Sequence, residues 1–187
     1  MRNFLRKSEK FFDYFANFLG ILSGICLFLL ACFVFYNVCA RYFFHSGNVA
    51  FQELEWHFFA AMFMLGMIYS LKEDAHVRVD VLFENFSPKT KAIVNILGTF
   101  LFIIPFAFLV AYLSFDFVSE AYISKEGSGD PGGLPYRFII KSLIPISFLC
   151  LIFYSFGFVI KNINAIFAVN DGKTPEFLQK INGAKEV

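Results

Sequence analysis

Four long apolar stretches organise the chain, and none of them carries a charged side chain near its middle. They cover residues 14–40, 51–71, 92–115 and 142–160. Each is close to or longer than the roughly 20 residues that a helix needs to cross the ~30 Å hydrocarbon core of a bilayer. Because lipid cannot hydrogen-bond to backbone amides and carbonyls, an apolar run of this length must be helical. The pattern therefore predicts an all-α integral membrane protein with four transmembrane helices.

The composition supports one membrane domain. Of 187 residues, 58% are hydrophobic and 17% are charged, whereas soluble domains carry about 25% charged residues. The formal net charge is +1, which gives no basic face for a nucleic acid. Because the connections between four helices are too short to fold a soluble domain, we expect residues 1–187 to form a single membrane domain, with 161–187 as a tail.

Lysine and arginine residues are distributed unevenly around the four stretches. Twelve lie before the first stretch, in the 72–91 connection or in the tail, and four lie in the other two connections. Cytoplasmic loops of membrane proteins are enriched in these residues. We therefore expect both termini and the 72–91 connection in the cytoplasm, and the other two connections in the periplasm.

Charged side chains near the middle of a membrane span are typical of ion and substrate pathways. The candidates closest to such a position all fall at span ends: Asp13, Arg41, Glu53, Glu55 and Asp116. The sequence thus disfavours an autonomous small four-helix transporter or channel, which stays as the alternative interpretation. Pro105, in the third stretch, predicts a simple kink in preference to the broken helix of a transporter.

The cysteines and histidines indicate neither redox chemistry nor a metal site. All four cysteines fall inside predicted spans, and no two of them form a C-x-x-C pair. Glu53 and His57 are four residues apart, but two ligands do not make a metal site. We therefore expect no enzymatic activity and no cofactor in this chain.

The first stretch has features of a helix-packing surface. Ala16, Gly20 and Gly24 follow a small-xxx-small pattern that allows close approach of another helix. That helix can belong to this chain or to a partner. Asn17 and Asn37, near the two ends of the stretch, are candidates for interhelical hydrogen bonds.

The 72–91 connection contains the sharpest motif, His76-Val77-Arg78-Val79-Asp80. Its mixture of apolar and charged residues predicts a short amphipathic segment at the membrane surface; a solvated turn is the alternative. Ser87-Pro88 predicts the N-cap and first residue of the third helix. In the tail, Thr174-Pro175 predicts the start of a short helix.

Three short segments of the sequence, taken in order, resemble the small membrane subunit of tripartite ATP-independent periplasmic (TRAP) transporters. They are Arg41-Tyr42, Glu53-Leu54-Glu55-Trp56 and the histidine-to-aspartate motif just described. The four-span layout is similar as well, and the likeness covers roughly residues 41–160. One departure is Leu54, because the family often has two adjacent glutamates before the second span.

The resemblance implies an accessory subunit that braces a much larger membrane subunit in the bacterial inner membrane. The large subunit would hold the sodium and substrate sites, and a periplasmic binding protein would deliver an organic acid of the sialic acid or C4-dicarboxylate class. Residues 125–135 look most like those of sialic acid systems. Membrane lipids would surround the complex. The transported substrate itself cannot be read from this chain.

Under this resemblance we expect two groups of interaction residues. The candidate subunit-interface residues are Gly20, Gly24, Arg41, Glu53, Glu55, Trp56, His76, Arg78 and Asp80. The candidate periplasmic docking-loop residues are Lys125, Glu126, Asp130 and Arg137. Glu53 and Glu55, at the periplasmic edge of the second span, either pair with cations of the large subunit or the binding protein or are solvated; the second alternative stays open because exposed ion pairs contribute little stability. The loop between the last two spans is either a docking loop or a simple connector, and Trp56 is expected at least to anchor the span at the membrane surface.

Overall fold

The computed structural model describes residues 2–74 and 86–171, and these are helical apart from short connections and ends. The helices are α1 (Arg2–Phe43), α2 (Val49–Lys72), α4 (Pro88–Gly98), the π-helical turn η1 (Thr99–Ile103), α5 (Ile104–Ile123) and α6 (Phe138–Asn170). Because α4, η1 and α5 run on as one helix, four helices are long and apolar enough to cross a membrane. The described residues contain no strand, so the predicted all-α membrane fold is confirmed.

Three predictions fall outside the described residues. They are the amphipathic segment with His76, Arg78 and Asp80, the helix start at Thr174-Pro175, and the position of the chain's last residues.

The helices extend beyond the apolar stretches that predicted them. α1 has 42 residues and is therefore about 60 Å long at 1.5 Å per residue, twice the thickness of a hydrocarbon core. α6 continues to Asn170, through the first ten residues of the predicted tail. Polar side chains beyond the apolar stretch support this extension by hydrogen-bonding to other helices. Lys161 Nζ, for example, donates to the carbonyl of Lys72 at 2.9 Å.

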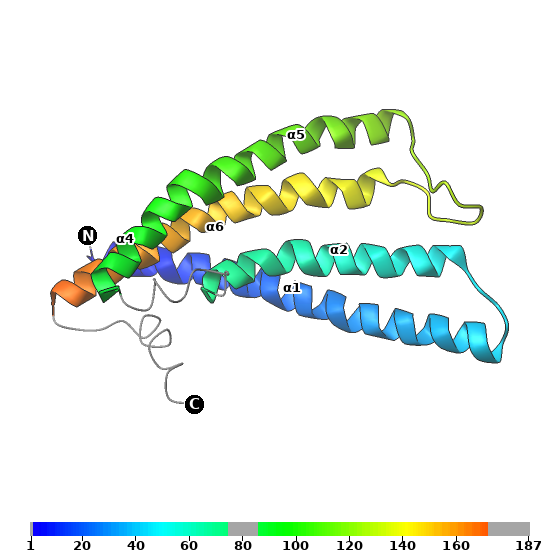
Figure 1. Ribbon diagram of the computed structural model, residues 1–187, viewed down its shortest axis with the longest axis horizontal. Coiled ribbons are helices and arrows are strands. Elements are labelled where there is room, and N and C mark those ends of the chain that lie inside the picture. The colour runs from blue at the N-terminus through cyan, green and yellow to red at the C-terminus, as the bar shows by residue number, and fades with distance from the viewer. Residues whose placement is uncertain (1, 75–85, 172–187) are drawn as a thin grey trace.

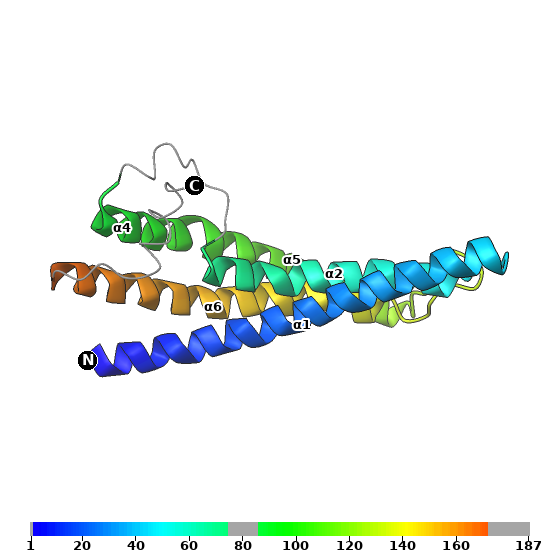
Figure 2. The ribbon, with the colours of Figure 1, turned by 90° about the horizontal axis from the view of Figure 1, so that it is seen from below.

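The four long helices form two hairpins, α1–α2 and α5–α6, which lie side by side (Figures 1 and 2). The connections 44–48 and 124–137 lie at one end of the molecule, here called the loop end. The start of α1 and the end of α6 lie at the other, here called the terminal end (Figure 1).

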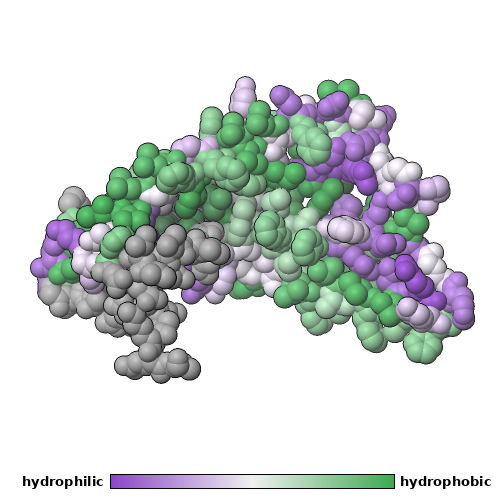
Figure 3. Space-filling view, viewed as in Figure 1, coloured by the Kyte–Doolittle hydropathy of each residue, from purple (hydrophilic) through white to green (hydrophobic). Residues whose placement is uncertain are grey.

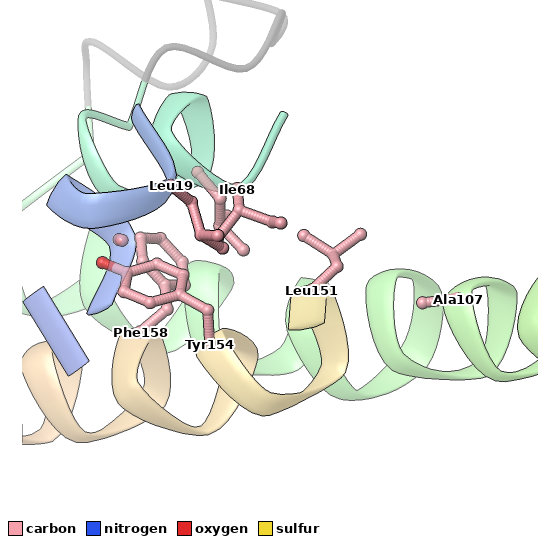
Figure 4. Close-up of a cluster of buried hydrophobic side chains, with 8 residues drawn as sticks. Leu19, Ile68, Ala107, Leu151, Tyr154 and Phe158 are labelled. Atoms are coloured by element: carbon pink, nitrogen blue, oxygen red, sulfur yellow. The ribbon is translucent and has the colours of Figure 1, made fainter. Parts of the chain in front are cut away.

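The buried apolar core lies toward the terminal end. Figure 4 shows its side chains coming together from both hairpins. The core is formed by Ala16, Leu19, Ile68, Leu71, Ala107, Leu151, Tyr154 and Phe158. The buried residues of α2, Ile68 and Leu71, both lie near its last turn. Toward the loop end the α1–α2 hairpin diverges from the α5–α6 hairpin (Figure 1), so apolar packing holds the hairpins together mainly at one end.

The outer surface matches a lipid environment. Apolar side chains cover the middle of the molecule, and hydrophilic ones gather at the loop end (Figure 3). Large aromatic side chains such as Phe28 and Phe35 on α1 are about 70% exposed, at 69% and 72%. An apolar surface of this extent is normal against lipid and not against water.

The third long helix begins where the sequence predicts, and it continues through Pro105. Ser87 is the N-cap of α4, with its Oγ accepting from the Thr90 amide at 3.2 Å, and Pro88 is the first helical residue. At Pro105, which has no amide proton to donate, the chain stays helical, and η1 ends two residues before it at Ile103. A wide π-turn of this kind is a known way to accommodate a distortion within a continuous helix.

Candidate functional site

The loop between α5 and α6 has a defined hydrogen-bonded shape. The Arg137 amide donates to the Glu126 carbonyl at 2.9 Å, and the Ser128 amide donates to the Leu134 carbonyl at 3.0 Å. These bonds pair the two sides of the loop. Its tip is a tight turn in which Gly132 has φ +84°, a backbone conformation that glycine adopts without strain.

Glu53, in the second turn of α2, binds this loop from the other hairpin. Its Oε1 accepts a hydrogen bond from Ser128 Oγ. Its Oε2 accepts one from the Leu134 amide at 2.6 Å, and Arg137 Nη2 lies 3.7 Å from Oε1. The side chain of Glu53 is only 13% exposed. The partners of this carboxylate are therefore groups of its own chain, a possibility that neither sequence interpretation of Glu53 contained.

The four candidate docking-loop residues differ in their surroundings. Glu126 pairs with Lys141, whose Nζ also lies 3.9 Å from the centroid of the Phe117 ring. Arg137 faces Glu53, as described, and remains partly exposed. Lys125 and Asp130 are exposed, so they are the members of the group that project from the loop surface.

Glu55 lies on a different side of α2 and contacts α1. Its Oε1 accepts a hydrogen bond from Asn37 Nδ2 at 2.9 Å, which confirms the interhelical bond predicted for Asn37. Next to this pair is an open groove of about 280 Å³ between α1 and α2, into which Arg41 also faces. The groove is lined by Val34, Asn37, Val38, Arg41, Tyr42, Gln52 and Glu55.

The small-residue pattern of α1 splits between the inside and the outside of the molecule. Ala16 belongs to the buried core. A Cβ atom at Gly20 would lie 2.5 Å from Cδ2 of Tyr69 on α2, so Gly20 serves packing within this chain. A Cβ at Gly24 would meet nothing within 4 Å. Gly24 is thus open to a neighbour outside the chain, and so is the exposed Asn17, which lies one helical heptad before it.

Trp56 is 70% exposed at the loop end of α2. This position fits the predicted anchoring role, since tryptophan is enriched at the boundary between lipid and water.

Sequence reasoning missed the polar pairs between helices toward the terminal end. Tyr154 Oη donates to Asp13 Oδ1 at 3.2 Å, and Asn164 Nδ2 donates to Glu9 Oε2 at 2.6 Å. Asn95 and Asn162, both buried, join their amides at 3.0 Å. Asn95 lies within a predicted span, and a polar amide in that setting was the available signal for an interhelical bond.

Within residues 2–74 and 86–171, no three histidine, cysteine or carboxylate side chains come together as a group that could hold a metal ion. The four cysteines are not joined in disulfides.

Comparison with known proteins bears directly on this architecture. The sequence model of the family described as tripartite ATP-independent periplasmic transporters, DctQ component, matches residues 30–165. One Haemophilus influenzae protein named as a TRAP transporter small permease protein is 30% identical over 146 residues, covering 78% of this chain and 86% of that protein. A second one from the same organism is 30% identical over 118 residues, covering 63% and 73%.

No solved structure gives a significant match to the chain. The family match nonetheless covers most of the sequence and three of the four long helices in full or nearly so, and the family consists of transporter components, not enzymes. The chain therefore belongs to the DctQ family of TRAP transporter small membrane subunits and is a multi-pass protein of the bacterial inner membrane.

Proposed function

We propose that this chain is the accessory scaffold subunit of a sodium-coupled TRAP importer and braces the large transport subunit. The observation that carries the proposal is the position of its polar groups. Within the described residues, most buried polar side chains hydrogen-bond to other groups of the same chain, as in the Asn95–Asn162 and Asn37–Glu55 pairs; the buried Ser147 hydroxyl is an exception. Such bonds stabilise helix packing, and the described residues show no row of buried charged side chains of the kind that ion pathways use.

The unequal distribution of lysine and arginine supports an orientation with the terminal end in the cytoplasm and the loop end in the periplasm. In this orientation the periplasmic binding protein would meet the loop end. Lys125 and Asp130 are exposed there and are the residues we propose for this contact.

The large subunit would pack against the apolar outer face within the membrane. Gly24, Arg41 and Trp56 are exposed and are our candidates for contacts with it. His76, Arg78 and Asp80 are proposed for its cytoplasmic side from the family resemblance. The sodium ions and the substrate, an organic acid of the sialic acid or C4-dicarboxylate class, would bind in the large subunit.

An affinity purification tests the scaffold role. The tagged full chain is extracted from membranes of its host with a mild detergent, and its partners are identified by mass spectrometry. We expect a large multi-spanning membrane protein in stoichiometric amount. Arg78→Ala should lower its recovery without reducing membrane insertion of this chain, whereas Lys89→Ala, which changes another basic residue of the same connection, should not.

Transport by the reconstituted proteins separates this role from the alternative of an autonomous transporter. Liposomes that contain both membrane subunits, supplied with the binding protein, should take up labelled sialic acid or C4-dicarboxylate when a sodium gradient is applied. Liposomes that contain this chain alone should not. Uptake by the chain alone would contradict the scaffold proposal, and uptake without sodium would contradict the coupling.

A further inference from the structure

The two hairpins are joined unequally at their two ends. At the terminal end, apolar side chains from α1, α2 and α6 meet in the buried core. On α2 this burial is confined to Ile68 and Leu71, about four turns away from Glu53. The loop end lacks a comparable buried cluster among the described residues, so polar contacts contribute more to holding the hairpins together there.

Glu53 supplies such contacts from a fixed position. The side chain of Asn48 caps α2 by accepting from the Ala50 amide at 2.9 Å, which sets where the helix begins. Glu53 follows in the second turn and reaches the Ser128 hydroxyl and the Leu134 amide with its two carboxylate oxygens. Charged acceptors make stronger hydrogen bonds than neutral ones. One side chain of the α1–α2 hairpin thus satisfies two donors of the α5–α6 hairpin.

The loop is shaped to fit this carboxylate. Ser128 and Leu134 face each other across the loop through their backbone hydrogen bond, so Glu53 binds both sides of the loop at once. Between them, a Cβ atom at Gly133 would lie 2.9 Å from Glu53 Oε2 and 2.4 Å from Ser128 Oγ. A larger residue at position 133 would therefore displace the carboxylate or the hydroxyl.

We propose that Glu53 is a latch that fixes loop 124–137 on α2 and holds the two hairpins together at the loop end. With the latch closed, the exposed face of the loop has one shape. With the latch open, the loop loses its support from α2, and among the described residues the hairpins are then joined mainly toward the terminal end, by the core and by polar bonds such as Lys161 to the Lys72 carbonyl and Asn164 to Glu9. The latch is a property of this chain alone. If the function proposed above is correct, it also gives the binding protein a preformed surface.

Hydrogen exchange of the full chain in detergent or nanodiscs tests the latch. Exchange at the amides of the 126–137 segment is compared in the wild type, Glu53→Ala and Glu55→Gln. Local opening exposes amides without unfolding the core, so Glu53→Ala should speed exchange in this segment by about tenfold, the order expected when a charged hydrogen-bond partner is lost. Exchange around Tyr154 should stay the same, and Glu55→Gln should leave the loop unchanged.

A distance measurement provides a second readout. Spin labels at the exposed positions 52 and 130, in a chain whose four cysteines are replaced by serine, report the separation of α2 from the loop. The distance distribution should broaden in Glu53→Ala and in Ser128→Ala but not in Glu55→Gln.

Three results would overturn the inference. The first is unchanged loop exchange together with an unchanged distance distribution in Glu53→Ala. The second is faster exchange throughout the chain, which would make Glu53 a residue of the global fold. The third concerns Glu53→Asp, which keeps the charge but shortens the side chain by one methylene and is used if Glu53→Ala cannot be purified. Wild-type exchange rates in the loop of that variant would equally reject the latch. None of these measurements requires a transport partner, so failure of the latch is distinguishable from failure of the proposed function.

Discussion

Asn95 on α4 and Asn162 on α6 join two helices through their buried side-chain amides. Nδ2 of Asn95 donates to Oδ1 of Asn162 at 3.0 Å, and Nδ2 of Asn162 donates to the Phe158 carbonyl at 2.8 Å. The apolar cluster beside the pair is small and consists of Ala92 and Ala165 with Ile166 against them. With so little apolar packing, the amide pair fixes how α4 and α6 align.

Replacing Asn162 should therefore destabilise the chain. Asn162→Leu keeps the branched shape of the side chain but leaves the buried Asn95 amide without its acceptor. We expect the free energy of unfolding to fall by about 1–2 kcal/mol. This value lies between the average contribution of an interhelical hydrogen bond in membranes and the cost of an unsatisfied buried polar group. Reversible unfolding in mixed micelles measures it. Asn17→Leu, at an exposed asparagine of α1, is the control, and equal effects of the two changes would contradict the assignment.

Gly157 allows α6 to approach α1 closely. A Cβ atom there would lie 2.4 Å from Cβ of Phe12, an atom next to the backbone that cannot rotate away. Gly157→Ala should thus force the helices apart and cost about 1–3 kcal/mol, as overpacking does in other cores. At Gly98 a Cβ would meet nothing within 4 Å, so Gly98→Ala should be nearly neutral. The same unfolding assay compares them, and a neutral Gly157→Ala would show that α1 and α6 are not packed this tightly.

The sequence was sufficient for the elements that depend on local chemistry. Apolar length predicted the four membrane helices, and the serine-proline pair at 87–88 predicted where α4 begins. The partners of Glu53 could not be predicted, because one is a backbone amide that has no sequence signature and both are more than 70 residues away. Gly20 and Gly24 belong to the same small-residue pattern but have opposite surroundings. This difference could not be predicted, because the pattern indicates only that a helix can approach and not which helix does.

The Asn37–Glu55 bond requires an acceptor at position 55 and not a charge. Glu55→Gln keeps a side-chain oxygen that can accept from Asn37 Nδ2, so it should preserve the stability of the chain. Glu55→Leu leaves the buried Asn37 amide unpaired and should destabilise the chain by roughly 1–3 kcal/mol. Thermal unfolding in detergent checks both. A loss of stability in Glu55→Gln as large as in Glu55→Leu would mean that the negative charge itself is needed, for instance opposite the nearby Arg41.

Substitutions at Gly20 and Gly24 distinguish packing within the chain from contact with a partner. Gly20→Leu should disturb the α1–α2 hairpin, because the space is filled by the Tyr69 ring, and the isolated chain should lose stability. Gly24→Leu adds its side chain to open space, so the isolated chain should unfold like the wild type.

If α1 presents Gly24 to the large TRAP subunit, as proposed, Gly24→Leu should still reduce recovery of that subunit in the affinity purification, because small residues are what allow close contact between membrane helices. Gly98→Leu, at another open glycine but on a different helix, is the matched control. Full recovery of the large subunit with Gly24→Leu would place lipid at this face of α1. The partner would then have to bind another face of the molecule, and the loop-end surface of α2 around Trp56 would be the next one to change.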